Sequence, residues 1–132
     1  MTPVHIDAPV WRDYFAGRSP ELGDRVDELI AQRLARISAA ALQEVLAQAS
    51  SPAAGDRLAE ALLGLCEAGD AARIARQAGR MACRLREEGQ AAPPPLRLAA
   101  AAAALEARAP LLTTDASLHA VARLFPLKVL CG

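Results

Sequence analysis

The chain has 132 residues, 53% of them hydrophobic, so it can build one core but is too short for two domains. Fifteen basic and fifteen acidic side chains cancel, which leaves no general electrostatic attraction for nucleic acid. There is no signal-peptide pattern at the start, three scattered cysteines suit a reducing cytosol, and the longest apolar stretch is far below the roughly 20 residues that cross a bilayer. We therefore expect a single domain over residues 1–132, in a soluble cytoplasmic protein with no membrane partner.

In the first half of the chain, two short strands alternate with helices. Residues 4–7 form a partly β-branched segment that Pro9 stops, which predicts a first strand ending on an aspartate. Residues 36–38 predict a weaker second strand, and Ser38 is a suitable N-cap for the helix that follows it. Apolar residues at helical spacing predict helices over residues 10–16, 21–33, 40–49 and 57–67.

The second half continues this alternation. Asp70 is predicted to cap a long helix over residues 71–88, and a nearly all-apolar helix over residues 96–107 should be buried on most sides. The remaining predicted elements are a buried strand over 110–113, a short helix over 118–123 and a last strand over 127–130. Short strands that alternate with longer helices predict an α/β fold with a mostly parallel sheet.

Three acidic residues fall where such a sheet would gather functional groups. Asp7 ends the first strand, Glu44 lies early in the helix after the second, and Asp115 follows the buried strand. Open parallel sheets collect functional groups at the carboxyl ends of their strands. Carboxylates that converge there suit Mg²⁺ or Mn²⁺, which prefer oxygen ligands and activate water for phosphodiester cleavage. On spacing alone, a turn or a helix cap explains such an acid more often than a metal does.

Four segments form a further pattern in chain order. They are HIDAPVWRDYFAG over 5–17, SAAALQEVL over 38–46, LLTTD over 111–115 and FPLKVL over 125–130. These segments resemble the sequence blocks of VapC-like PIN domains, the ribonuclease toxins of type II toxin–antitoxin systems. The resemblance implies a three-layer α/β/α PIN domain with a short central sheet, and Mg²⁺- or Mn²⁺-dependent endoribonuclease activity on RNA. It also implies a VapB-like antitoxin as partner and a homodimer.

The resemblance assigns roles to individual residues. Asp7, Glu44 and Asp115 fall on the catalytic acids of the family, with Asp7 and Asp115 as metal ligands. Thr113 falls on a threonine that is expected to hydrogen-bond a neighbouring carboxylate.

The sequence also departs from the family pattern at the site. Arg97 stands where the family carries an aspartate at the start of a helix, Ser117 replaces a frequent acid, and Ala8 and Pro9 replace hydroxyl or amide residues. A guanidinium keeps its proton at working pH. At ~4 Å from a divalent ion it would contribute a repulsion of roughly 8 kcal/mol at an effective dielectric constant of 20, an upper guide because the side chain can swing away.

Arg97 therefore leaves two readings open. In the first, it pairs with Asp7 or Asp115 and fills the site with a salt bridge in place of metal. In the second, it points outward to contact phosphate while the remaining acids hold the metal. The leading hypothesis for function is a VapC-like ribonuclease; the alternative is a degenerate PIN domain without nuclease activity, acting as a binding or regulatory module.

Other side chains have plainer explanations. His5 is expected to be a core or edge histidine rather than a general base. Trp11 and Tyr14, with Phe15, are expected to pack on the sheet or at a dimer interface rather than to stack RNA bases. The long helix carries arginines that form either a local basic patch or, as we favour, a solvated face: Arg73, Arg76, Arg80, Arg84 and Arg86.

Overall fold

The computed structural model describes residues 1–131, which form one sheet of five parallel strands. The strands are β1 (Val4–Ile6), β2 (Ala35–Ser38), β3 (Cys66–Glu67), β4 (Leu111–Thr113) and β5 (Val129–Cys131). Their order is β3-β2-β1-β4-β5, and each neighbouring pair is parallel. The strand order reverses between β1 and β4, so the crevice that open parallel sheets form at such a switch point lies beyond the carboxyl ends of these two strands.

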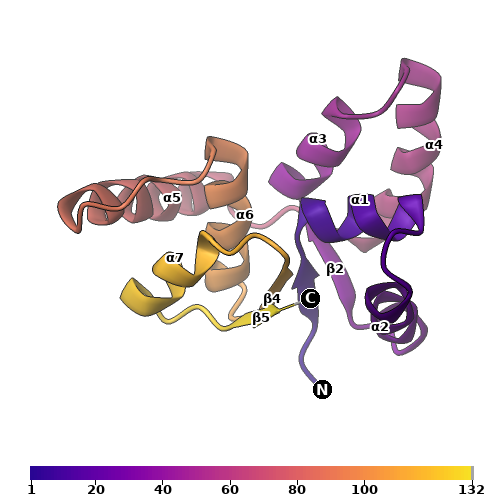
Figure 1. Cartoon of the computed structure of the whole chain (residues 1–132). Coiled ribbons are helices and arrows are strands. Elements are labelled where there is room, and N and C mark those ends of the chain that lie inside the picture. Colours follow the sequence, from indigo (N-terminus) through magenta and orange to yellow (C-terminus); the bar gives the residue numbers. More distant parts are fainter. Residues whose placement is uncertain (132) are drawn as a thin grey trace.

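Seven α-helices surround the sheet within residues 1–131 (Figure 1). They are α1 (Ala8–Ala16), α2 (Pro20–Ala31), α3 (Ala39–Ala47), α4 (Pro52–Leu62), α5 (Ala71–Glu87), α6 (Pro95–Glu106) and α7 (Leu118–Leu124). None of the helices in this described part of the chain combines the length and the apolar content needed to cross a membrane.

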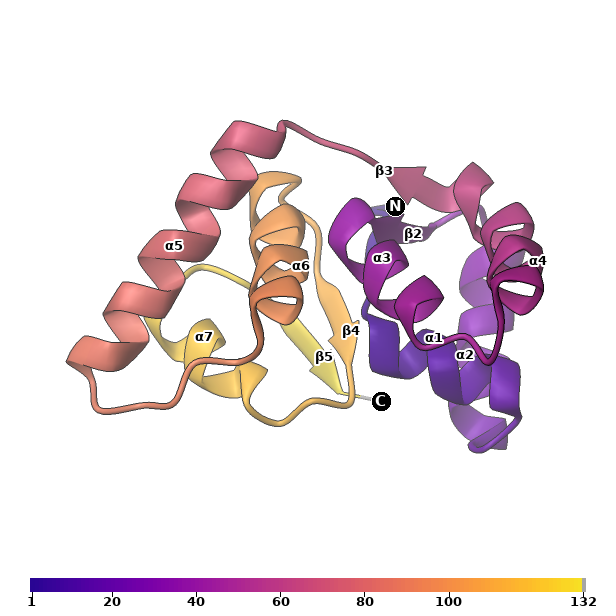
Figure 2. The ribbon, with the colours of Figure 1, turned by 90° about the horizontal axis from the view of Figure 1, so that it is seen from above.

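The helices lie on both faces of the sheet. Successive residues of a strand point to opposite faces. Leu112 belongs to a buried cluster with Ile6 and with residues of α1, α2 and α3, whereas its neighbour Leu111 belongs to a second buried cluster built from α5, α6 and α7. Figure 2 shows the two groups of helices, α1 to α4 on one side and α5 to α7 on the other. The result is a three-layer α/β/α arrangement.

Two predicted elements were wrong in their bounds. The helix predicted over residues 57–67 ends at Leu62 and is followed by a 3-10 turn, η1 (Leu63–Leu65), and then by β3. β3 forms because Cys66 and Glu67 pair with the end of β2, a contact between distant segments that leaves no local sequence signal. The last strand starts at Val129 rather than at Leu127, since the Leu127 N–H donates to the Phe125 carbonyl in a turn.

Ser38 fixes the junction between β2 and α3. Its Oγ accepts a hydrogen bond from the Ala41 N–H at 3.1 Å, and the residue is buried. Replacing Ser38 with alanine is expected to lower the free energy of unfolding by about 1 kcal/mol, because the first turn of α3 loses its capping acceptor. Urea denaturation measures this loss. The exposed Ser50, which lies between α3 and α4, is replaced in the same way as a control and should change stability by less than about 0.5 kcal/mol. Equal effects of the two substitutions would contradict the capping role.

Candidate functional site

The charged residues singled out from the sequence lie together at the carboxyl edge of the sheet. Asp7 directly follows β1 and is the N-cap of α1, and Asp115 follows β4. Glu44 lies on α3, and Arg97 lies in the first turn of α6. Seen from above, α3 and α6 run side by side over this edge (Figure 2). The topology thus brings three acids and one arginine to the crevice beyond β1 and β4.

Asp7 is fully buried, and both of its carboxylate oxygens accept hydrogen bonds. Oδ1 accepts from the Ala8 N–H at 2.9 Å, and Oδ2 accepts from Thr113 Oγ1 at 2.8 Å. Thr113 Oγ1 in turn accepts from the Asp115 N–H at 3.0 Å. One threonine therefore fixes the orientation of Asp7 and couples it to the segment that carries Asp115.

Arg97 points inward, between the three carboxylates. Its Nε and Nη2 donate to the two carboxylate oxygens of Glu44 at 3.2 and 2.6 Å, a bidentate pair. Nη1 donates to Asp115 Oδ2 at 2.5 Å, and Nε lies 3.6 Å from Asp7 Oδ2. The positive end of the helix dipole disfavours a cation in the first turn of α6. The carboxylates, not the helix, therefore stabilise the guanidinium in this position.

The residues present do not fit a divalent cation in this arrangement. The site has six carboxylate oxygens, and each already accepts a hydrogen bond from a protein donor. Asp115 Oδ1, the last of them, accepts from the N–H and the hydroxyl of Ser117 at 2.9 and 2.7 Å. Consistently, residues 1–131 contain no group of three or more His, Cys, Asp or Glu side chains arranged to hold a metal ion. The guanidinium stands where the carboxylates converge.

Burial and pairing shift the pKa values of the site residues. Burial raises the pKa of Asp7 to about 6, although the hydrogen bond from Thr113 and the charge of Arg97 oppose the rise. Burial also acts to raise the pKa of Asp115, but hydrogen bonds from Ser117 and Arg97 outweigh it and the net shift is downward. Burial acts to lower the pKa of Arg97, and the surrounding carboxylates more than reverse this. Arg97 therefore stays protonated.

Asp7 is expected to make stability fall as pH rises. Its pKa increases from 3.8 to about 6 on folding, so its contribution is fully present below the lower value and is lost as pH rises through the higher one. Asp7→Asn removes this titration. As pH rises from about 4 to about 8, the unfolding free energy of Asp7→Asn should increase relative to that of wild type, by at most about 3 kcal/mol. Urea titrations over this pH range measure the change, with Asp56→Asn at an exposed position as control. If the unfolding free energy of Asp7→Asn relative to wild type is as independent of pH as that of Asp56→Asn, the prediction is contradicted.

The remaining candidates lie outside this cluster. His5 is buried, and its Nε2 is 3.1 Å from Glu67 Oε1, a partner on β3 that the sequence did not indicate. Trp11 is also buried, with its ring 5.8 Å from that of Tyr14 and 6.0 Å from that of Phe15. These aromatic rings pack on one another, while Phe15 remains 43% exposed.

The strand order and the helices on both faces define a PIN-like three-layer α/β/α fold, which confirms the predicted fold class. No family model matches the sequence, and no curated protein sequence matches it. Solved structures of VapBC proteins, in contrast, share the fold over nearly the full length of the chain.

Two VapBC structures and one structure of another name illustrate the likeness. VapBC2 from Rickettsia felis, bound to a DNA fragment from its promoter, aligns with a TM-score of 0.76 and 15% identity over 99% of both chains. VapBC-1 from nontypeable Haemophilus influenzae aligns with a TM-score of 0.72 and 19% identity over 98% of both chains. FitAcB from Neisseria gonorrhoeae aligns with a TM-score of 0.71 and 16% identity over 96% of this chain and 95% of the other. At these identities, the likeness establishes the fold and leaves the activity to be inferred from the site.

Proposed function

We propose that this chain is a VapC-like subunit of a toxin–antitoxin type of complex in which Arg97 takes the place of the divalent cation. The observation that carries the proposal is the inward guanidinium, which donates to Glu44 and Asp115 and lies 3.6 Å from Asp7. In this role the chain is a binding or regulatory module rather than a metal-dependent ribonuclease.

Electrostatics supports this choice over an active metal site. A divalent ion at ~4 Å from the guanidinium would meet a repulsion of roughly 8 kcal/mol at an effective dielectric constant of 20. Outward rotation of Arg97 would avoid the repulsion, but it would break the bidentate pair with Glu44 and the bond to Asp115. Charge-assisted and bidentate hydrogen bonds are the strong ones in proteins, so both routes oppose metal binding.

The proposed partner is a small antitoxin of the VapB type, because several of the solved structures that share this fold are VapBC structures. A groove of mixed apolar and charged lining supports a partner. Phe15 is 43% exposed and lines this groove of about 450 Å³ together with Val45 and Leu58, with Arg12 and Arg18 also in the lining. Exposed aromatic surface beside a groove is typical of a protein–protein contact. A homodimer, which the family resemblance implies, belongs to the same proposal.

An RNA cleavage assay tests the proposed loss of nuclease activity. Wild type and Asp7→Asn are incubated with structured and single-stranded RNA in Mg²⁺ and in Mn²⁺. We expect the two proteins to give the same background, because the carboxylates already bind a guanidinium. Cleavage by wild type that Asp7→Asn abolishes would instead establish the metal-dependent ribonuclease.

A separate experiment tests the antitoxin. This chain is coexpressed with the protein encoded beside it, and light scattering measures the mass of the purified material. A stable complex of the two proteins is expected.

A further inference from the structure

A second candidate site lies at the opposite, amino edge of the sheet. A groove of about 820 Å³ is lined by residues that precede strands, among them Thr2, Pro110 and Lys128. A smaller hollow of about 210 Å³ adjoins it along α5, and both include Gln77 and Arg80. We call these two hollows together the amino-edge groove. None of the residues lining it belongs to the Arg97 cluster.

The amino-edge groove is strongly cationic in a chain whose net charge is zero. Its cationic side chains, all exposed, come from α5, from the turn after α6 and from the start of β5: Arg73, Arg76, Arg80, Arg108 and Lys128. The single carboxylate in the lining, that of Glu106, is engaged by Arg73 and Gln77, each at 3.2 Å. The other four cations make no ion pair within residues 1–131. The exposed arginines of α5 fit the solvated helix face that the sequence favoured, and Arg108 and Lys128 add cations from two further parts of the chain.

The backbone at Arg108 has a conformation that arginine rarely adopts. Arg108 has a φ of 54°, in the left-handed region, and its N–H and that of Ala109 bond back to the Leu105 and Ala104 carbonyls. These bonds form the helix-ending motif that normally places glycine at this position, because a Cβ is unfavourable there. A cation near a helix C-terminus is favourable, which offsets part of the strain.

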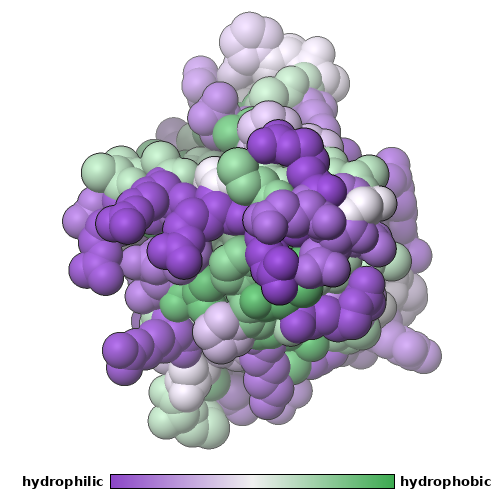
Figure 3. All heavy atoms as spheres, turned by 90° about the vertical axis from the view of Figure 1, so that its left-hand side faces the viewer, coloured by the Kyte–Doolittle hydropathy of each residue, from purple (hydrophilic) through white to green (hydrophobic). Residues whose placement is uncertain are grey.

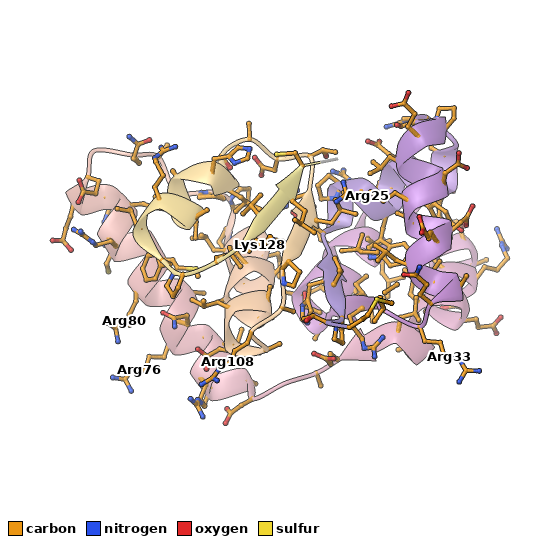
Figure 4. The ribbon with its side chains drawn as sticks, turned by 90° about the horizontal axis from the view of Figure 1, so that it is seen from below. Arg25, Arg33, Arg76, Arg80, Arg108 and Lys128 are labelled. Carbon is orange, nitrogen blue, oxygen red and sulfur yellow. The ribbon has the colours of Figure 1, made fainter. Side chains whose placement is uncertain are left out.

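The floor of the groove is apolar. Leu105, Ala109 and Phe125 line it beneath the cationic rim. Figure 3 looks onto the side of the molecule that carries α5 and α7, where a strip of apolar surface lies between hydrophilic borders. In Figure 4, Arg76 and Arg80 project outward from α5 at one end of the molecule with Arg108 beside them, Lys128 lies further towards the middle, and Arg33 projects from the opposite end.

We propose that the amino-edge groove binds a single-stranded nucleic acid, with the cations on its phosphates and the apolar floor under its bases. Arg73, Arg76 and Arg80 share one face of α5 and extend over about 10 Å, which suits several phosphates rather than a single anion. Guanidinium groups pair with phosphate in a bidentate manner and also stack on bases. A cationic track beside an aromatic ring is how proteins hold single strands without reading their sequence. This inference concerns a different edge of the sheet and does not depend on whether the Arg97 site is active.

Binding of labelled oligonucleotides to the full chain tests the proposal. Fluorescein-labelled single-stranded RNA and DNA of about ten nucleotides are titrated by anisotropy at several salt concentrations, with a poly-glutamate peptide as competitor. Arg80→Gln, Arg108→Gly and Lys128→Gln should each weaken binding at least about threefold and flatten its salt dependence. The two titrations show whether RNA or DNA binds more tightly. Binding of either supports the proposal that the amino-edge groove holds a single strand.

The glycine substitutions make a matched pair. Arg33 occupies the same left-handed position at the end of α2, with a φ of 61°, but lies outside the groove. Arg108→Gly and Arg33→Gly both relax the backbone, so neither should lower the melting temperature. Only Arg108→Gly should weaken oligonucleotide binding. Three results would overturn the proposal: no binding of either oligonucleotide at low salt, equal weakening by the two glycine variants, or displacement of the oligonucleotide by poly-glutamate at matched charge.

Discussion

Replacing Arg97 with methionine is expected to lower the free energy of unfolding by about 3 kcal/mol at neutral pH. The substitution keeps the apolar stem but removes the charge that three carboxylates share. Asp7 is fully buried, and the side chains of Glu44 and Asp115 are only 10% and 19% exposed, so water replaces little of the lost interaction. Removing one partner of such a network leaves the other charges buried and unpaired, which is why the loss exceeds that of a surface ion pair.

Acid should reduce the effect of Arg97→Met. Without the guanidinium, the carboxylates have raised pKa values and become protonated as pH falls, which relieves their repulsion. The gap between wild type and variant should therefore narrow towards about pH 5. Arg57→Met removes an exposed arginine from α4 and serves as control, with an expected change below about 0.5 kcal/mol. A loss at Arg97 no larger than that at Arg57, measured by urea denaturation, would mean that the network does not stabilise the fold.

Replacing Arg97 with aspartate is expected to create divalent-cation binding. The change removes the repulsive charge and adds a fourth carboxylate to a cluster at the switch point of the sheet. Even a third of the roughly 8 kcal/mol repulsion at ~4 Å corresponds to an affinity gain of about 100-fold. Calorimetric titration with Mn²⁺ measures the gain, and bound Mn²⁺ should raise the melting temperature of the variant with increasing ion concentration.

The double variant Arg97→Asp with Asp7→Asn separates a specific site from general charge. It has the same net charge as the single variant Arg97→Asn. It differs in that one carboxylate oxygen of residue 7, next to β1, is replaced by an amide nitrogen. Binding that persists unchanged in the double variant would place the ion elsewhere on the protein. Equal Mn²⁺ affinity of wild type and Arg97→Asp would show that the guanidinium does not exclude the cation.

Much of the fold followed from local patterns in the sequence. Ser38 and Asp70 were predicted as N-caps, and both accept hydrogen bonds from the first turns of α3 and α5. The strand at β1 could be predicted because it is short, partly β-branched and stopped by Pro9, and the strand at β4 because it is a short apolar run. β3 could not, because two residues at a sheet edge become a strand only through pairing with β2.

The grouping of the acids could be inferred from the chain order, but the direction of Arg97 could not. A residue in the first turn of a helix is free to point into a crevice or out to solvent. The choice depends on how far the Glu44 and Asp115 oxygens lie from the guanidinium, which is a property of the assembled layers. The pair of His5 and Glu67 was missed for a related reason, since its acid lies on the strand that had been predicted as helix.

The occupancy of the Arg97 site is tested most directly by a crystal structure of the wild-type protein grown in Mn²⁺, with anomalous diffraction to locate the ion. We expect no anomalous peak between Asp7 and Asp115, and a guanidinium that donates to Glu44 and Asp115 in that place. A Mn²⁺ peak bound by Asp7 and Asp115, with Arg97 rotated out to solvent, would contradict this expectation.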